Sequence, residues 1–189
     1  SFRDPEFKDC FWINPLGYHF SQMKVSDLCL MNQNGELVYG KERTGDAAQS
    51  IHSNIYKSRP DINAVAHAHP MYGKTFSTLN KELKPITQDS CAFYKRTTTF
   101  TDYDGVANGP DEGINIAKAL ADKDFLILQN HGILTTGTMV ETTLWYFLNM
   151  EEACKSQLLA EAVGEPIIIP DKVAIHTRDY VANDLSAFA

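Results

Sequence analysis

The chain has 189 residues, of which 43% are hydrophobic and 22% are charged, and its formal net charge is -7. These values are typical of a globular protein with a buried core, so we expect a single domain over residues 1–189. The negative net charge and the lack of a basic cluster argue against nucleic acid or an acidic membrane surface as the main partner.

The four cysteines are scattered along the chain without a C-x-x-C pair, which argues against a zinc knuckle or a dithiol redox motif. The sequence contains no signal-peptide core and no apolar run long enough to span a bilayer. We therefore expect a reduced, cytoplasmic protein. The chain begins at Ser1 without Met and soon enters strand-like sequence, so we expect an N-terminal part of the domain to be missing.

The first quarter of the chain favours antiparallel strands. Residues 10–14 and 28–31 are rich in β-prone side chains, and residues 36–39 form a third such run. The sequence Asn-Gln-Asn-Gly at residues 32–35 is typical of a hairpin turn.

From residue 44 onward the pattern changes, and helices and strands are expected to alternate. Apolar side chains at helical spacing predict a helix that begins near Thr44 or Asp46, either of which could cap it, and ends at Pro60. The later expected elements are a strand at 63–68, a short helix at 72–79, an extended segment at 95–103, a helix at 109–121, strands at 124–129 and 133–136, and a long helix at 138–162. Residues 163–189 are expected to extend the same domain. This alternation predicts an α/β fold.

Two histidines at the end of the expected strand 63–68 suggest a metal site. Side chains two residues apart on a strand face the same side, so His67 and His69 should project together. A third histidine, His131, follows the apolar run of the strand expected at 124–129. Three neutral imidazoles with an open position are common in catalytic metal sites. Spacing alone also allows a plainer interpretation, with two polar residues at a strand end and one histidine in a glycine turn.

Two stretches resemble the class II aldolase/adducin family: SRPDINAV at residues 58–65 with the H-x-H pair that follows it, and LQNHGIL at residues 128–134. The resemblance covers roughly residues 1–162. It implies a three-layer α/β/α sandwich around a mainly antiparallel central sheet. It also implies a homo-oligomer, often a tetramer, that acts on a small-molecule substrate near subunit interfaces. In that family, the histidines that match His67, His69 and His131 bind one divalent metal ion, and imidazole suits Zn, Mn and Fe alike.

The chain departs from the sugar-phosphate aldolases of this family at three places. Their Ser-Ser-Glu run, whose Glu is the catalytic base, falls on Asp46, Ala47 and Ala48, and Ala48 cannot accept a proton. Asp46 would also repel a phosphate dianion. The family's T-P-T-G phosphate turn reads NPLG at residues 14–17, and its acid tyrosine should fall near residues 87–89, where there is no tyrosine. We therefore do not expect an ordinary sugar-phosphate aldolase.

We expect instead a divalent-metal-dependent carbon–carbon lyase, decarboxylase- or aldolase-like, that acts on a small non-phosphorylated carbonyl or carboxylate substrate. A metal ion can stabilise the enolate that forms when carbon dioxide is lost. This reaction needs no base, because no proton is removed from carbon. The candidate catalytic residues are Tyr94 and His19, and the candidate substrate contacts are Gln88 and Asn130. Two alternatives stay open: a non-catalytic, adducin-like oligomerising domain that binds protein, and a non-haem Fe(II) oxygenase on the same fold.

Overall fold

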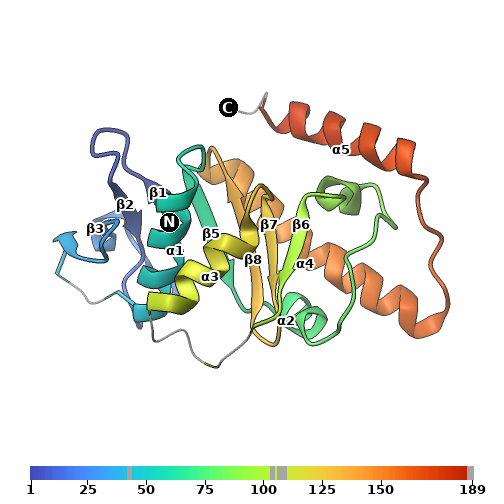
Figure 1. The fold of residues 1–189 in the computed structure, drawn as a ribbon, viewed down its shortest axis with the longest axis horizontal. Coiled ribbons are helices and arrows are strands. Elements are labelled where there is room, and N and C mark those ends of the chain that lie inside the picture. The colour runs from blue at the N-terminus through green and yellow to red at the C-terminus, as the bar shows by residue number, and fades with distance from the viewer. Residues whose placement is uncertain (42–43, 103–104, 106–109, 187–189) are drawn as a thin grey trace.

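The computed structural model describes residues 1–41, 44–102, 105 and 110–186. Within them, eight strands form one sheet in the order β4-β3-β2-β1-β5-β8-β7-β6 (Figure 1). Every pairing is antiparallel except that of β6 with β7, so the predicted mainly antiparallel sheet is confirmed. The strands are β1 (Phe2–Arg3), β2 (Cys10–Ile13), β3 (Cys29–Asn32), β4 (Leu37–Tyr39), β5 (Ala64–Ala68), β6 (Thr97–Phe100), β7 (Phe125–Leu128) and β8 (Gly132–Gly137).

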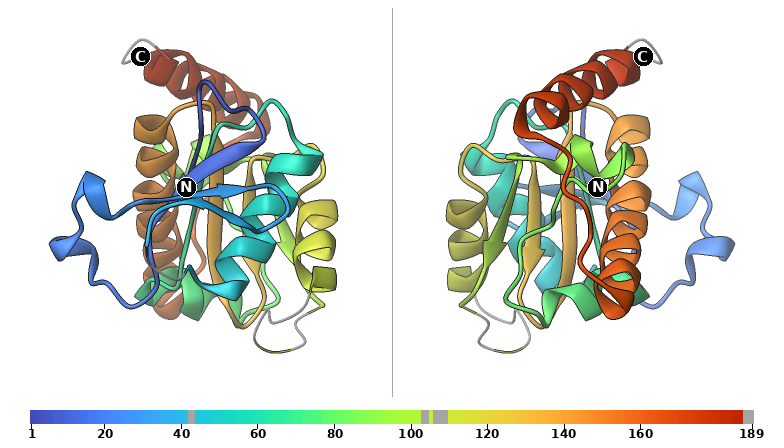
Figure 2. Two further views of the ribbon diagram at one scale, coloured as in Figure 1. Left: turned by 90° about the vertical axis from the view of Figure 1, so that its left-hand side faces the viewer. Right: turned by 90° about the vertical axis from the view of Figure 1, so that its right-hand side faces the viewer.

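Helices cover both faces of the sheet and produce the expected three layers (Figure 2). The α-helices are α1 (Asp46–Ser58), α2 (Met71–Ser77), α3 (Pro110–Leu120), α4 (Val140–Val163) and α5 (Asp171–Ser186), and the short 3-10 helices are η1 (Phe20–Gln22), η2 (Val25–Asp27) and η3 (Asp89–Phe93). Helices α1 and α3 pack together on one face, while α2 and α4 pack together on the other. No α-helix among the described residues is long and apolar enough to cross a membrane.

Strand β7 shows how the sheet separates two hydrophobic cores. Its residues Leu126 and Leu128 belong to the core under α1 and α3, whereas Phe125 and Ile127 belong to the core under α2 and α4. Successive side chains of a strand point to opposite faces, and all four of these are buried because both faces are covered. The short apolar run of this strand is therefore a consequence of its central place between two helical layers.

Three regions differ from the sequence-based expectations or add to them. Helix α1 begins at Asp46 with Gly45 as its N-cap, so neither Thr44 nor Asp46 holds the N-cap position. The segment between β2 and β3 projects from the body of the molecule (Figure 2). Helix α5 packs on η3, and the assignment of residues 163–189 to the same domain stays a prediction.

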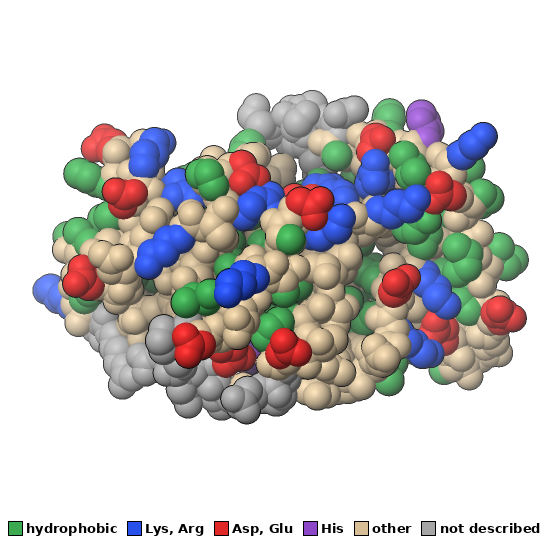
Figure 3. All heavy atoms as spheres, in the orientation of Figure 1, with side chains coloured by type: hydrophobic (Ala, Val, Ile, Leu, Met, Phe, Trp, Pro, Cys, Tyr) green, Lys and Arg blue, Asp and Glu red, His purple; other side chains and the backbone are tan. Residues whose placement is uncertain are grey.

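Basic and acidic side chains are interspersed over the face of the molecule that Figure 3 shows. Several of the surface ions form pairs, such as Arg59 with Asp61 at 2.7 Å and Lys95 with Asp171 at 2.6 Å. Among the described residues on this face, side chains of a single sign form no extended patch that could attract a polyanion.

Candidate metal centre

The three histidines come together because of the way β5, β8 and β7 pair. His67 lies opposite Leu134 in the antiparallel ladder of β5 and β8, and β8 pairs in turn with β7, where Leu128 lies opposite Gly132. The short turn from β7 to β8, which contains His131, therefore lies beside the end of β5. Sheet pairing alone brings two distant parts of the chain to one place.

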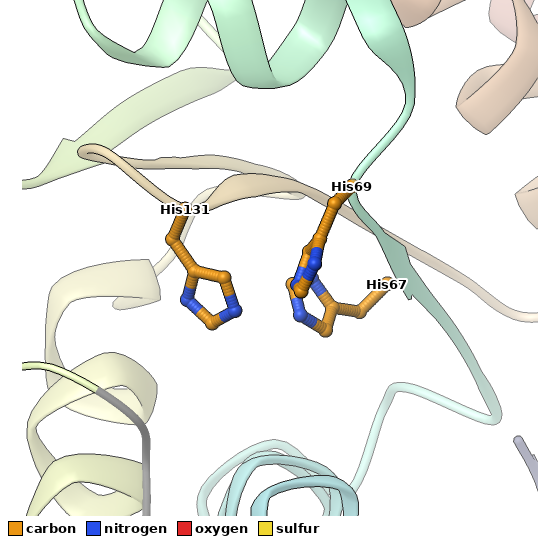
Figure 4. Close-up of side chains that lie close together, drawn as sticks. All are labelled: His67, His69 and His131. Atoms are coloured by element: carbon orange, nitrogen blue, oxygen red, sulfur yellow. The ribbon is translucent and has the colours of Figure 1, made fainter. Parts of the chain in front are cut away.

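The imidazole rings converge from these two segments (Figure 4). The ring centroids lie 5.2 Å apart for His67 and His69, 4.9 Å for His67 and His131, and 4.5 Å for His69 and His131. One ligand nitrogen from each ring lies within 4.8 Å of the others. Among the described residues, this is the group of His, Cys, Asp or Glu side chains arranged so that it could hold a metal ion.

The backbone around His131 is shaped for this approach. Asn130 has a φ of 56°, a left-handed conformation that Asn tolerates better than most residues. The amide of His131 donates to the carbonyl of Leu128 at 3.0 Å, which closes the turn. At Gly132, a Cβ atom would lie 2.5 Å from the carbonyl oxygen of Ala68 and 3.0 Å from Cδ2 of His69. The glycine is therefore needed for close packing of β8 against the end of β5.

The electrostatic environment keeps the three imidazoles neutral. Burial, together with the neighbouring His131, lowers the pKa of His67 to about 3, and burial and His69 lower the pKa of His131 to about 4. Burial also lowers the pKa of His69. Neutral imidazole is the form that binds a metal ion, so at neutral pH no proton has to leave before binding.

The chemistry of this donor set fits a divalent transition metal. Three imidazole nitrogens suit Zn, Mn or Fe, and they leave further coordination positions for a substrate or water. In the described residues no carboxylate belongs to the cluster. The three ligands are uncharged, so a bound divalent ion would keep its full charge of about +2 and would attract an anionic substrate.

Of the other candidate residues, only Asn130 adjoins the cluster in sequence, and its side chain is exposed. His19 is exposed on the projecting β2–β3 segment, where its Nδ1 lies 2.7 Å from Oγ of Ser21. The structure does not bring His19 into the histidine cluster.

Tyr94 and Gln88 lie at the opposite end of the β6–β7 pair from His131. They precede β6, which runs parallel to β7, while His131 follows the far end of β7. The hydroxyl of Tyr94 donates to Asp171 of α5 at 2.6 Å, and Gln88 is exposed at the start of η3. Within one chain, these two residues therefore do not meet the three histidines.

Sequence reasoning missed two groups that form hydrogen bonds at or next to the cluster. The carbonyl oxygen of Ile133 accepts a hydrogen bond from Nδ1 of His67 at 3.0 Å. The carboxylate of Glu151 accepts hydrogen bonds from two amides just after His69. The position of a backbone carbonyl cannot be predicted from the sequence. The sequence indicates Glu151 only as an acidic residue next to Met150, which is buried in α4. The side chains at 46–48 lie outside the described part of the chain.

Comparison with known proteins gives consistent matches. A family model described as Class II Aldolase and Adducin N-terminal domain matches residues 1–158. Decarboxylase NovR of Streptomyces niveus is 40% identical over 172 residues, which cover 90% of this chain and 64% of that protein. A protein of Streptomyces roseochromogenus subsp. oscitans, named 4-hydroxy-3-prenylphenylpyruvate oxygenase/4-hydroxy-3-prenylbenzoate synthase, is 38% identical over 183 residues, which cover 96% of this chain and 66% of that protein.

A solved structure also matches closely. The L-fuculose 1-phosphate aldolase from Glaciozyma antarctica PI12 has a TM-score of 0.85 and 43% sequence identity, covering 95% of this chain and 70% of that one. The chain spans only 64% and 66% of the length of the two Streptomyces proteins.

Proposed function

Because the chain belongs to the class II aldolase and adducin family, we propose that it is a divalent-metal-dependent enzyme that cleaves a carbon–carbon bond by decarboxylation. The observation that carries the proposal is the convergence of three neutral imidazoles, His67, His69 and His131, at the end of β5. Two relatives named as a decarboxylase and as an oxygenase/synthase support it.

The three histidines would hold the metal, with Nε2 of His67 as one donor because its Nδ1 is bonded to a carbonyl. When bound, the divalent ion supplies a Lewis acid that polarises a carbonyl oxygen of the substrate. The half-buried rings of His67 and His131 and the exposed ring of His69 would leave one side of the site open to solvent and substrate.

The departures from the aldolase sequence pattern favour decarboxylation over aldol cleavage. Ala48 occupies the position of the aldolase base in the family pattern, and a methyl group cannot accept the proton of an enolising carbon. Decarboxylation removes carbon dioxide instead of a proton from that carbon. The turn at residues 14–17 carries Leu16, which is 58% exposed, where the aldolases have a hydroxyl donor, so we propose a substrate without phosphate.

The names of the two Streptomyces relatives narrow the proposed substrate class. They describe a decarboxylase and an enzyme of a prenylated hydroxyphenylpyruvate, which is an aromatic 2-oxo acid. For the lyase we propose an aromatic or similar β-oxo acid, because its polarised carbonyl can accept the electron pair of the breaking carbon–carbon bond as an enolate. The proposed enzyme is a homo-oligomer, with a tetramer as the favoured form. The second name also supports another candidate reaction on the same site, oxidative decarboxylation by a non-haem Fe(II) oxygenase.

Metal analysis tests the proposal. Protein purified without a His-tag or chelator should contain about one divalent ion per chain, and the His131→Ala variant should contain almost none. Release of carbon dioxide from a panel of β-oxo and 2-oxo acids, with and without oxygen, separates the two reactions, because only the oxygenase consumes oxygen and prefers Fe(II). A folded protein that takes up no metal even after reconstitution would point instead to an adducin-like binding domain.

A further inference from the structure

His69 differs from the other two histidines in how the fold holds it. His67 lies within β5, paired with Leu134, and its ring is bonded to the carbonyl of Ile133. His69 lies beyond the last residue of β5, its side chain is exposed, and no hydrogen bond to its ring occurs among the described residues. The position of His69 therefore depends on the backbone that follows it.

That backbone is the start of α2, and it is held by a side chain from a different helix. Pro70 is the N-cap of α2 and makes no capping hydrogen bond through its side chain. In its place, the carboxylate of Glu151 on α4 accepts hydrogen bonds from the amide of Tyr72 at 2.9 Å and from the amide of Gly73 at 2.6 Å. These amides belong to the first turn of a helix, where no backbone acceptor is available to them. Each oxygen of Glu151 satisfies one of them.

Packing of α2 on β8 links the start of α2 to the rest of the site. A Cβ atom at Gly73 would lie 3.0 Å from the Ile133 side chain, so α2 lies directly on β8. On the other side, Cδ2 of His69 lies close to Gly132. Movement of the start of α2 would therefore carry His69 away from His67 and His131.

We propose that Glu151 is a positioning residue for the metal site, which fixes His69 by clamping the first turn of α2 to α4. The inference rests on the proposed metal binding. Both oxygens are engaged, so an amide side chain would present one acceptor and one donor to two N–H groups. The loss of one bond, and of a negative charge at a helix start, would loosen the backbone next to His69.

The test compares two glutamates of α4 that receive the same substitution. Glu151→Gln disrupts the clamp, while Glu161→Gln removes an equal charge from a carboxylate that accepts from Lys81 at 2.5 Å, beyond the end of α2. Co²⁺ affinity of the folded, metal-free full chain is measured by competition with a chelator, and the visible spectrum of bound Co²⁺ reports its coordination geometry. Urea unfolding of the metal-free proteins measures the stability lost by each variant.

We expect Glu151→Gln to weaken Co²⁺ binding by about 10-fold and to alter the spectrum, because loss of groups that orient metal ligands commonly has an effect of this size. Glu161→Gln should bind within about twofold of the wild type, even if it is equally destabilised. Equal Co²⁺ affinity and spectra for the two variants would overturn the positioning role, because Glu151 would then be a structural contact only. A wild-type protein that binds no Co²⁺ would instead overturn the proposed metal-dependent function, and this inference with it.

Discussion

Nδ1 of His67 lies 3.0 Å from the backbone carbonyl oxygen of Ile133, on the neighbouring strand. A carbonyl oxygen only accepts, so Nδ1 is the donor and carries the ring proton, and Nε2 keeps a free lone pair. Ile133 pairs with Ala68, the residue after His67, in the β5–β8 ladder. The pairing that forms the centre of the sheet therefore also selects the tautomer of this imidazole.

Metal removal should lower stability by an amount that grows with the logarithm of the affinity of the site. A ligand that binds only the folded state, present at 100 times its dissociation constant, stabilises that state by about 2.7 kcal/mol. We expect the wild-type melting temperature to fall by several degrees when EDTA is added, as followed by circular dichroism. The His69→Ala variant should show no such fall, and an equal fall in that variant would mean that the metal binds elsewhere.

The metal-free protein should lose stability as the pH drops below about 6.5. The pKa values of His67 and His131 are lowered to about 3 and about 4, so below their unfolded value of 6.5 the unfolded chain binds more protons. His67, the more deeply buried of the two, then lowers the free energy of unfolding by up to about 1.4 kcal/mol per pH unit until its folded pKa is reached, and the half-buried His131 contributes less because solvent screens it.

Urea unfolding of the EDTA-treated protein between pH 7.5 and 5 measures this slope. The His67→Gln, His131→Ala double variant removes two of the depressed histidine pKa values and should show a shallower dependence. An unchanged slope in the double variant would mean that other groups govern the acid sensitivity.

The Gly132→Ala substitution should damage both the fold and the site. Its Cβ would lie 2.5 Å from the Ala68 carbonyl oxygen, so β8 and the end of β5 would have to separate. Overpacking of this kind costs about 1–3 kcal/mol of unfolding free energy, and we expect weaker metal binding as well. The matched control is Gly164→Ala, because a Cβ at Gly164 meets nothing within 4 Å. Urea unfolding and metal titration compare the stability and the metal affinity of the two variants. Equal losses in both variants would contradict the steric argument.

Much of the fold could be predicted because its signals are local. The strand expected at 63–68 is found at Ala64–Ala68, and the strand expected at 124–129 is found at Phe125–Leu128. Both are apolar runs that end at a residue or turn that cannot continue a strand. The hairpin after β3 could also be predicted. Gly35 takes a φ of 82°, and the side-chain oxygen of Asn32 accepts hydrogen bonds from the amides of Asn34 and Glu36.

What could not be predicted depends on contacts between distant residues. The clamp between Glu151 and the start of α2 requires knowledge of how α4 lies on the sheet. The place of Tyr94 depends on the direction of β6 relative to β7, which no local pattern encodes. The roles assigned to His19, Gln88, Tyr94 and Asn130 stay predictions.

Substitution of Asn130 can separate a backbone role from a role in substrate binding. Its φ of 56° suits glycine, so Asn130→Gly should leave the free energy of unfolding and the metal affinity unchanged within about 0.5 kcal/mol. Asn130→Val should destabilise the protein by about 1–2 kcal/mol, because a β-branched residue is strained there. If the amide contacts substrate, Asn130→Gly raises KM while metal content stays at the wild-type level. An unchanged KM would remove Asn130 from the substrate contacts.

The ladder between β5 and β8 also determines when the site appears during folding. Pairings between distant segments close slowly, whereas the β2–β4 hairpins involve neighbours in sequence. Until the ladder closes, the chain offers a metal ion only the pair His67 and His69, because His131 arrives with β8. Metal uptake during refolding would thus report the pairing of β5 with β8, which is a late step. A metal ion in the refolding buffer would slow the reopening of this pair of strands and would leave the formation of the β2–β4 hairpins unaffected.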